Sequence, residues 1–163
     1  MFGLIAKTFG MFCPATMTNP ISIQIREFHF PTDYDSVYQL WESIEKGVRV
    51  GRSDTPREIE KKLNRDPDLF LVAESDNKIV GSVIGGFDGR RGMIYHLAVA
   101  SEFRGNGIGS RLMEELESRM RAKGCLKSYL LVTVDNPEAE EYYKLHGWQP
   151  MGHQVHLMGK ELA

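Results

Sequence analysis

Arg104-Gly105-Asn106-Gly107-Ile108-Gly109 stands between a predicted strand at Met93 to Val99 and a long predicted helix at about Gly107 to Lys123. Glycines at a helix N-terminus let the backbone approach a ligand closely, and the unpaired N–H groups and positive helix end favour a phosphate. No Lys-Ser/Thr pair follows the loop as in a Walker motif, and the glycine spacing is not GxGxxG. The loop therefore predicts an anion site, with a tight strand-to-helix turn as the alternative.

Strand and helix patterns extend outward from this loop in both directions, and they predict the remaining elements by their periods of 2 and 3.6 residues. Short turns such as Ser75-Asp76-Asn77 indicate hairpins, which favour a mixed sheet over a doubly wound parallel one. The predicted strands are Ile21 to Phe28, Leu69 to Ala73, Lys78 to Ile84, Ser128 to Val134 and at least one within Trp148 to Met158. The other predicted helices run from Thr32 or Asp33 to Gly47, from Thr55 through Leu63, and from Pro137 to Leu145.

The composition predicts one domain, which we place at 20–163. The first residues are broken by Gly3, Gly10 and Pro14 and predict an N-terminal extension at 1–19, with a tail packed on the domain or on a neighbouring subunit as the alternative. A chain of 163 residues with 42% hydrophobic content can build a single core. A net charge of −2 lacks the basic excess of a dedicated nucleic-acid binder, and no stretch is long and apolar enough to predict a membrane span. Cys13 and Cys125 lack CxxC spacing, so neither a disulfide framework nor a metal site is predicted, and the cytoplasm is the expected location.

Two segments carry a resemblance to the GNAT superfamily of N-acetyltransferases. Leu97-Ala98-Val99 followed by Arg104-x-x-Gly107-x-Gly109 is similar to the superfamily's Arg/Gln-x-x-Gly-x-Gly/Ala motif after a strand. The segment from Asn136 to Trp148 resembles its Asn-x-x-Ala-x-x-aromatic-Tyr-x-x-x-Gly-aromatic motif. Within the superfamily, the chain looks most like the small bacterial YpeA-type acetyltransferases. The resemblance implies an α/β (α+β) GNAT fold, with a mixed, mostly antiparallel sheet of six to seven strands and about four flanking helices.

The resemblance also implies that acetyl-CoA is the co-substrate and that its acetyl group passes directly to a primary amine of a small molecule or a polypeptide. The strand edge at Leu97, Ala98 and Val99 would pair with the pantetheine arm, and Asn136 would contact that arm from the opposite side. The Leu97 N–H would polarise the acetyl carbonyl, and Tyr143 would contact the cofactor and protonate the leaving thiolate. The pyrophosphate would be held by the loop residues Arg104, Gly105, Asn106, Gly107, Ile108, Gly109 and Ser110.

The sequence departs from the family's best-known pattern at the position of the general base. Enzymes that use a strand glutamate carry it four residues before the Leu97 position, where this chain has Met93. Tyr95 and His96 are the nearest titratable groups, and an imidazole ordinarily titrates near neutral pH. Strand alternation predicts that His96 lies on the face opposite Tyr95 unless a bulge intervenes, so a structural role is the alternative for this histidine.

The acceptor is left open by the sequence. In this fold, the first two helices and the loop between them usually build the acceptor pocket, and Arg49 and Arg52 in that loop would suit a carboxylate. Solvated loop charges are the alternative for both arginines. A non-catalytic acyl-CoA sensor of the same fold, and an enzyme acting on nucleotide phosphates, are the competing functions. Homodimer formation is an expectation taken from family behaviour.

Overall fold

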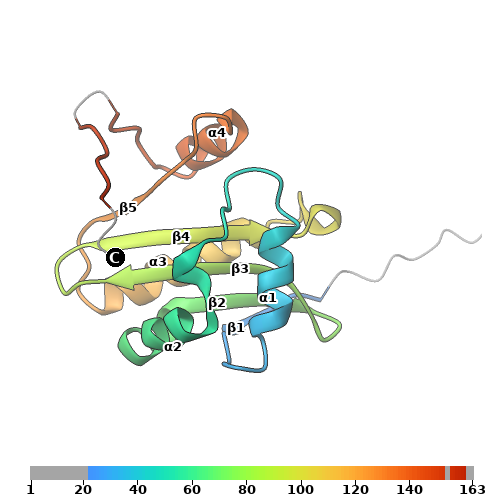
Figure 1. Ribbon diagram of the computed structural model, residues 1–163. Coiled ribbons are helices and arrows are strands. Elements are labelled where there is room, and N and C mark those ends of the chain that lie inside the picture. The colour runs from blue at the N-terminus through green and yellow to red at the C-terminus, as the bar shows by residue number, and fades with distance from the viewer. Residues whose placement is uncertain (1–21, 153–154, 161–163) are drawn as a thin grey trace, which may run out of the picture.

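The computed structural model describes residues 22–152 and 155–160, and a five-stranded mixed sheet forms its centre (Figure 1). The first four strands are antiparallel neighbours in chain order, and the fifth pairs parallel to the fourth. This arrangement confirms the predicted mixed, mostly antiparallel sheet. The strands are β1 (Gln24–Glu27), β2 (Phe70–Ser75), β3 (Lys78–Phe87), β4 (Gly92–Val99) and β5 (Ser128–Leu130). The extension predicted at 1–19 lies outside the described residues.

Four helices flank the sheet in the described residues, as predicted, and they cover both of its faces. The face covered by the first two helices carries one buried apolar cluster, and the opposite face carries a second cluster under the third helix. The last helix follows β5, beyond the edge of the sheet (Figure 1). The helices are α1 (Tyr34–Glu42), α2 (Pro56–Arg65), α3 (Ile108–Ala122) and α4 (Pro137–Leu145), and the short turn η1 (Arg52–Asp54) precedes α2.

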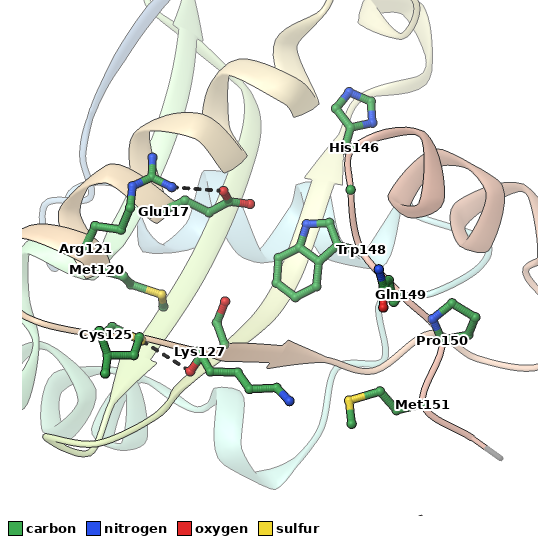
Figure 2. Close-up of a pocket in the computed structure, with 13 residues that line it drawn as sticks. Glu117, Met120, Arg121, Cys125, Lys127, His146, Trp148, Gln149, Pro150 and Met151 are labelled. Atoms are coloured by element: carbon green, nitrogen blue, oxygen red, sulfur yellow. Dashed lines mark hydrogen bonds and ion pairs between the residues drawn. The ribbon is translucent and has the colours of Figure 1, made fainter. Parts of the chain in front are cut away.

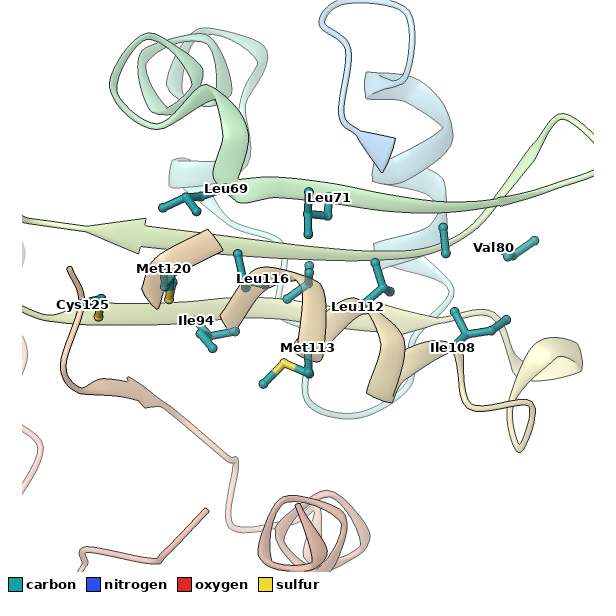
Figure 3. Packing of buried hydrophobic residues seen from close by; sticks show 12 residues of the cluster. Leu69, Leu71, Val80, Ile94, Ile108, Leu112, Met113, Leu116, Met120 and Cys125 are labelled. Atoms are coloured by element: carbon teal, nitrogen blue, oxygen red, sulfur yellow. The ribbon is translucent and has the colours of Figure 1, made fainter. Parts of the chain in front are cut away.

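The long helix α3 fixes where the glycine loop lies. Its apolar residues recur every three or four positions and are buried against β2, β3 and β4 (Figure 3). Gly107 precedes its first turn with φ of +72°, and Gly124 follows its end with φ of +85°. Because the left-handed region is costly for residues with a Cβ, glycine suits both ends of this helix. The apolar face of α3 therefore anchors the loop at the end of β4.

The prediction for the C-terminal part of the sheet is wrong. Six to seven strands were predicted, but the described residues form five, and the stretch predicted as a strand at Trp148 to Met158 has no regular structure in its described residues. Pro150 cannot donate to a strand ladder, and Val155 and Leu157 remain exposed without a partner surface. The fifth strand is also shorter than predicted, because it ends at Leu130 instead of Val134.

No helix in the described part of the chain is both long enough and apolar enough to span a membrane.

Candidate functional site

The strands β4 and β5 separate partway along their length and leave one edge of β4 open. Their parallel pairing runs from Gly92 opposite Ser128 to Ile94 opposite Leu130. Beyond Leu130 the chain turns away toward α4, while β4 continues to Val99 (Figure 1). The segment from Leu97 to Val99, which is predicted to pair with a pantetheine arm, therefore does not pair with β5.

A cavity of about 890 Å³ lies beside this open edge and contains the glycine loop. Gly105 and Gly107 have φ of +78° and +72°, and a Cβ built at Gly109 would lie 3.3 Å from the Tyr142 hydroxyl oxygen. The loop therefore depends on glycine both for its backbone conformation and for its close approach to α4. The cavity is lined by residues that include Leu97, Ala98, Val99, Arg104, Gly105, Gly107, Ile108, Gly109, Ser110, Asn136 and Tyr143.

Some predicted loop residues contact the protein itself through their side chains. The Arg104 Nε donates to the Val99 carbonyl oxygen at 3.1 Å, and the Asn106 Nδ2 donates to the Phe103 carbonyl oxygen at 3.0 Å. The side chains of Ile108 and Ala98 are buried in the two apolar clusters. For Ile108 and Ala98, only backbone groups remain to contact a ligand.

A smaller cavity of about 250 Å³ adjoins the first one, and the two share Lys46, Leu97, Asn136 and Tyr143 among their lining residues. The loop between α1 and α2 forms part of its wall and approaches Asn136 closely. A Cβ built at Gly47, whose φ is +94°, would lie 2.9 Å from Asn136 Nδ2. Contact between this loop and the start of α4 therefore encloses the region beside Leu97.

Tyr143 lines both cavities, and its side chain is partly buried against the apolar cluster under α3. Burial, and secondarily the neighbouring Tyr142, raises the pKa of Tyr143 to about 12. The centroids of the Trp148 and Tyr143 rings lie 6.2 Å apart. The Tyr143 hydroxyl makes no hydrogen bond to any described residue. A phenol with this pKa stays protonated at neutral pH and can donate a proton.

Tyr142 has a different environment, although spacing alone does not distinguish the two tyrosines. Its hydroxyl lies 3.3 Å from Ser110 Oγ, and the Nε2 of His146 lies 2.9 Å from the same Oγ. Burial raises the pKa of Tyr142, while the hydrogen bond with Ser110 opposes that effect. These contacts join the end of α4 to the first turn of α3 beside the glycine loop.

A β-bulge in β4 places His96 on the same side as Tyr95, contrary to the face expected from simple alternation. Ile84 pairs with Tyr95 and Ser82 with Ala98, so one residue of β3 stands opposite two residues of β4. His96 takes a φ of +50° within this irregularity. As a result, Tyr95 and His96 line the same two cavities, the small one and a further cavity next to α2.

Asp54 is a site residue that sequence reasoning missed. Its Oδ1 lies 2.8 Å from His96 Nε2, and its Oδ2 accepts a hydrogen bond from the Gly51 N–H at 2.7 Å. Tyr34 fixes the same turn by donating from its hydroxyl to the Asp54 carbonyl oxygen at 2.8 Å. In the sequence, Asp54 only precedes a helix start, and nothing signals its contact with a residue 42 positions later.

The cavity next to α2 has a volume of about 610 Å³ and meets the small cavity at Tyr95 and His96. Apolar and aromatic side chains form much of its wall. Charged side chains from α2 and the β3–β4 turn lie at the end of the cavity that is farthest from His96. The lining residues include Asp54, Ile59, Lys62, Arg65, Ile84, Phe87, Asp88, Arg91, Met93, Tyr95, His96 and Tyr129.

The two arginines predicted to hold an acceptor carboxylate take different positions. Arg49 lines the small cavity beside Leu97 and Tyr143. The exposed Asp135 is close enough to Arg49 for the guanidinium to contribute to lowering the pKa of this carboxyl, after larger effects from Thr133 and its own backbone. Arg52 begins η1 and does not line the small cavity or the one next to α2 in the described structure.

Another cavity, of about 650 Å³, lies apart from the glycine loop (Figure 2). It is formed between the C-terminal part of α3, the start of β5 and the segment that follows α4, with Trp148 beside it. None of the predicted site residues line it. The described residues also contain no cluster of three or more His, Cys, Asp or Glu side chains that could hold a metal ion.

A model of the acetyltransferase (GNAT) family matches residues 34–148, which is more than half of the chain. The protein therefore belongs to the GNAT family of acetyltransferases. The family resemblance carried by the two sequence motifs is thus confirmed.

Named relatives agree with this assignment. The chain is 46% identical to an acetyltransferase of Pectobacterium atrosepticum over 114 residues, which cover 70% of this chain and 79% of that protein. Among solved structures, Ard1 from Thermoplasma volcanium matches with a TM-score of 0.68 and 30% identity, over 78% of this chain and 82% of that one. The PaiA N-acetyltransferase from Thermoplasma acidophilum, in complex with coenzyme A, has a TM-score of 0.67, 20% identity and coverage of 77% and 89%. At that identity the last match supports the fold alone.

Proposed function

We propose that this protein transfers the acetyl group of acetyl-CoA directly to a primary amine of a small molecule or polypeptide. The observation that carries the proposal is the open edge of β4, which lies between the glycine loop and Tyr143 and borders connected cavities. The residues around it fit a ligand with phosphates and a peptide-like arm, because N–H groups of a helix start and an unpaired strand edge are both available. When bound, acetyl-CoA supplies a thioester whose acyl group an amine can attack.

In this proposal, the loop backbone from Arg104 to Ser110 holds the pyrophosphate, and the edge at Leu97 and Val99 binds the pantetheine amides. The Arg104 side chain, which donates to the Val99 carbonyl oxygen, moves off this carbonyl when the arm binds. The Leu97 N–H donates to the acetyl carbonyl oxygen and stabilises the negative charge that develops there. Asn136 contacts the arm from the other side of the cleft.

Tyr143 acts as the general acid in this proposal. The new bond forms between the acceptor nitrogen and the carbonyl carbon, and the bond between that carbon and sulfur breaks. The sulfur then takes the proton of the Tyr143 hydroxyl. The location of Tyr143 between the two cavities, and its protonation at neutral pH, support this role.

His96 acts as the general base, and Asp54 positions it. An ionised Asp54 can only accept hydrogen bonds, so the His96 Nε2 donates to it and a neutral imidazole keeps its lone pair on Nδ1. This nitrogen takes the proton that the attacking amine loses. The pairing replaces the strand glutamate that is absent at Met93, and Tyr95 lines the same space without this carboxylate partner.

The test is release of free CoA thiol by purified full-length protein in the presence of acetyl-CoA and a broad panel of primary amines. Turnover that falls about 10²- to 10⁴-fold in Tyr143→Phe, with little change in the KM for acetyl-CoA, supports the proposal. Tyr142→Phe is the matched control, because it removes a neighbouring hydroxyl from the same helix. Acetyl-CoA binding without thiol release from any amine would favour the acyl-CoA sensor instead.

A further inference from the structure

The two ends of the cavity next to α2 differ in charge. At the end where it meets the small cavity, the buried Asp54 carboxylate stands behind His96. At the other end, Arg91 has its guanidinium carbon 5.7 Å from the centroid of the Tyr129 ring, and Lys127 Nζ lies 5.3 Å from that centroid. Lys127 itself lies outside this cavity, so its basic lining residues far from His96 are Lys62, Arg65 and Arg91, whereas Asp54 is the charged residue beside the proposed reaction centre.

The carboxylates near the basic end are already engaged. Asp88 Oδ1 accepts hydrogen bonds from the backbone N–H groups of Arg91 and Arg90, which lower the pKa of this carboxyl. Asp66 pairs with Lys62 at 3.0 Å. Within the described part of the chain, Arg91 makes no ion pair with any carboxylate. Its guanidinium thus retains its donors for a ligand anion.

The length of β4 sets the spacing between these ends. Arg91 and His96 are five positions apart, and a strand rises about 3.3 Å per residue, so their backbones are separated by roughly 16 Å. Allowing for the reach of the arginine side chain, an anion held by Arg91 lies about 10 to 16 Å from an amine at His96. Free α-amino acids are much too short to span this distance, whereas an extended peptide spans it in three to five residues.

We propose that the acceptor cavity binds the N-terminus of an extended peptide that carries an Asp or Glu side chain at about its third to fifth residue. This inference rests on the proposed acetyl transfer and specifies its acceptor. The N-terminal amine lies at His96, the first side chains pack against the apolar wall that includes Phe87, Met93 and Tyr95, and the acidic side chain pairs with Arg91. Arg65 donates to the Phe87 carbonyl oxygen at 3.0 Å near the same end, but its Nε also lies 3.9 Å from Asp66 Oδ2, so Arg91 is the arginine that pairs with the peptide.

The test uses sets of synthetic peptides in which one position carries Glu, Ala or Lys and all other residues are the same. One set is made for each position from the second to the seventh residue. Each peptide is assayed with the full-length protein, with Arg91→Glu and with the matched control Arg90→Glu, whose side chain does not line the cavity. We expect the wild type to favour Glu over Ala at positions three to five by about tenfold in kcat/KM. Arg91→Glu reverses the preference toward Lys, whereas Arg90→Glu leaves it unchanged, and the KM for acetyl-CoA stays constant in all three proteins.

Equal turnover of Glu, Ala and Lys peptides, or an equal effect of the two arginine substitutions, overturns the acidic-peptide inference while leaving acetyl transfer intact. Acetylation of an ω-amino acid with a spacer of similar length, but of no peptide, overturns the peptide assignment and retains the anion site. If no amine releases thiol, the proposed function fails. Calorimetric titration of the Glu and Lys peptides in the presence of CoA then tests the Arg91 site independently of turnover. Tighter binding of the Glu peptide that is lost in Arg91→Glu supports the site, and equal binding of the two peptides overturns it.

Discussion

Asp54 Oδ1 and His96 Nε2 lie 2.8 Å apart, although the residues come from η1 and β4 and are 42 positions apart in the chain. The contact depends on the bulge that places His96 toward α1 and α2, where its ring also meets the Trp41 ring edge-on at 4.7 Å between centroids. A buried carboxylate beside an imidazole at the junction of two cavities has the arrangement of an oriented general base.

We predict that Asp54→Asn lowers kcat by about 10²- to 10³-fold, because the amide no longer fixes the His96 tautomer that keeps the lone pair on Nδ1. His96→Gln is expected to cause a similar loss, and the double variant should be no worse than either single one, since both residues serve one function. Steady-state kinetics at saturating acetyl-CoA measure these effects.

Tyr34→Phe is the control for this prediction. It removes the hydrogen bond to the Asp54 carbonyl oxygen and thereby loosens the same turn, but it leaves the carboxylate in place. If Tyr34→Phe lowers kcat as strongly as Asp54→Asn, the contact between Asp54 and His96 has a structural role only. Additive losses in the Asp54 and His96 variants would lead to the same conclusion.

Most of the fold could be predicted from the sequence because its elements are marked by local signals. The Ser75-Asp76-Asn77 turn, where Asp76 and Asn77 have φ of +48° and +60°, and the apolar face of α3 both depend on residues close together in the chain. The prediction of a C-terminal strand was wrong because alternation of apolar and polar residues in Trp148 to Met158 indicates only that the segment could pair with another strand. Whether a strand forms also depends on a partner edge and an apolar surface, which no local pattern supplies.

The sequence motifs name candidate site residues, but they do not name those residues that only long-range packing brings to the same place. The glycine loop, Leu97 and Tyr143 line one cavity beside the open edge of β4, and their roles toward acetyl-CoA stay a prediction. The position of His96 required a bulge that the sequence does not mark, because no glycine stands at the residue with positive φ. Asp54 was missed because its partner is brought to it only by the packing of α1 and η1 against the sheet.

We predict that Gly107→Ala and Gly124→Ala lower the free energy of unfolding by similar amounts, of about 1 to 2 kcal/mol, but that only Gly107→Ala weakens acetyl-CoA binding. Both glycines have positive φ, and a Cβ at either position meets no atom within 4 Å, so the cost arises from the backbone conformation alone. Gly107 precedes the first turn of α3 in the proposed pyrophosphate site, whereas Gly124 follows the opposite end of the helix. Relaxation of the Gly107→Ala backbone turns loop N–H groups away from the phosphates.

Denaturant unfolding and calorimetric titration with acetyl-CoA measure the two quantities separately. We expect the Kd for acetyl-CoA to rise about tenfold in Gly107→Ala and to stay within twofold in Gly124→Ala. Unchanged binding in Gly107→Ala would contradict a pyrophosphate site at this loop. An equal rise in both variants would mean that binding responds to the stability of α3 and not to the loop conformation.

The last prediction concerns the stability of the protein in alkaline solution. The pKa of Tyr143 rises from 10.0 to about 12 on folding, because burial disfavours the phenolate. Above pH 10 the unfolded chain therefore loses this proton while the folded protein keeps it, so the stabilisation is complete below pH 10 and disappears as the pH rises through about 12. At 1.36 kcal/mol per pKa unit, the part of the stability lost in this way is on the order of 2 to 3 kcal/mol. The wild type should thus lose about that much more unfolding free energy between pH 9 and pH 12 than Tyr143→Phe. Parallel pH dependence of wild type and Tyr143→Phe would show that folding does not raise the pKa of Tyr143 and that its phenol is not shielded from water.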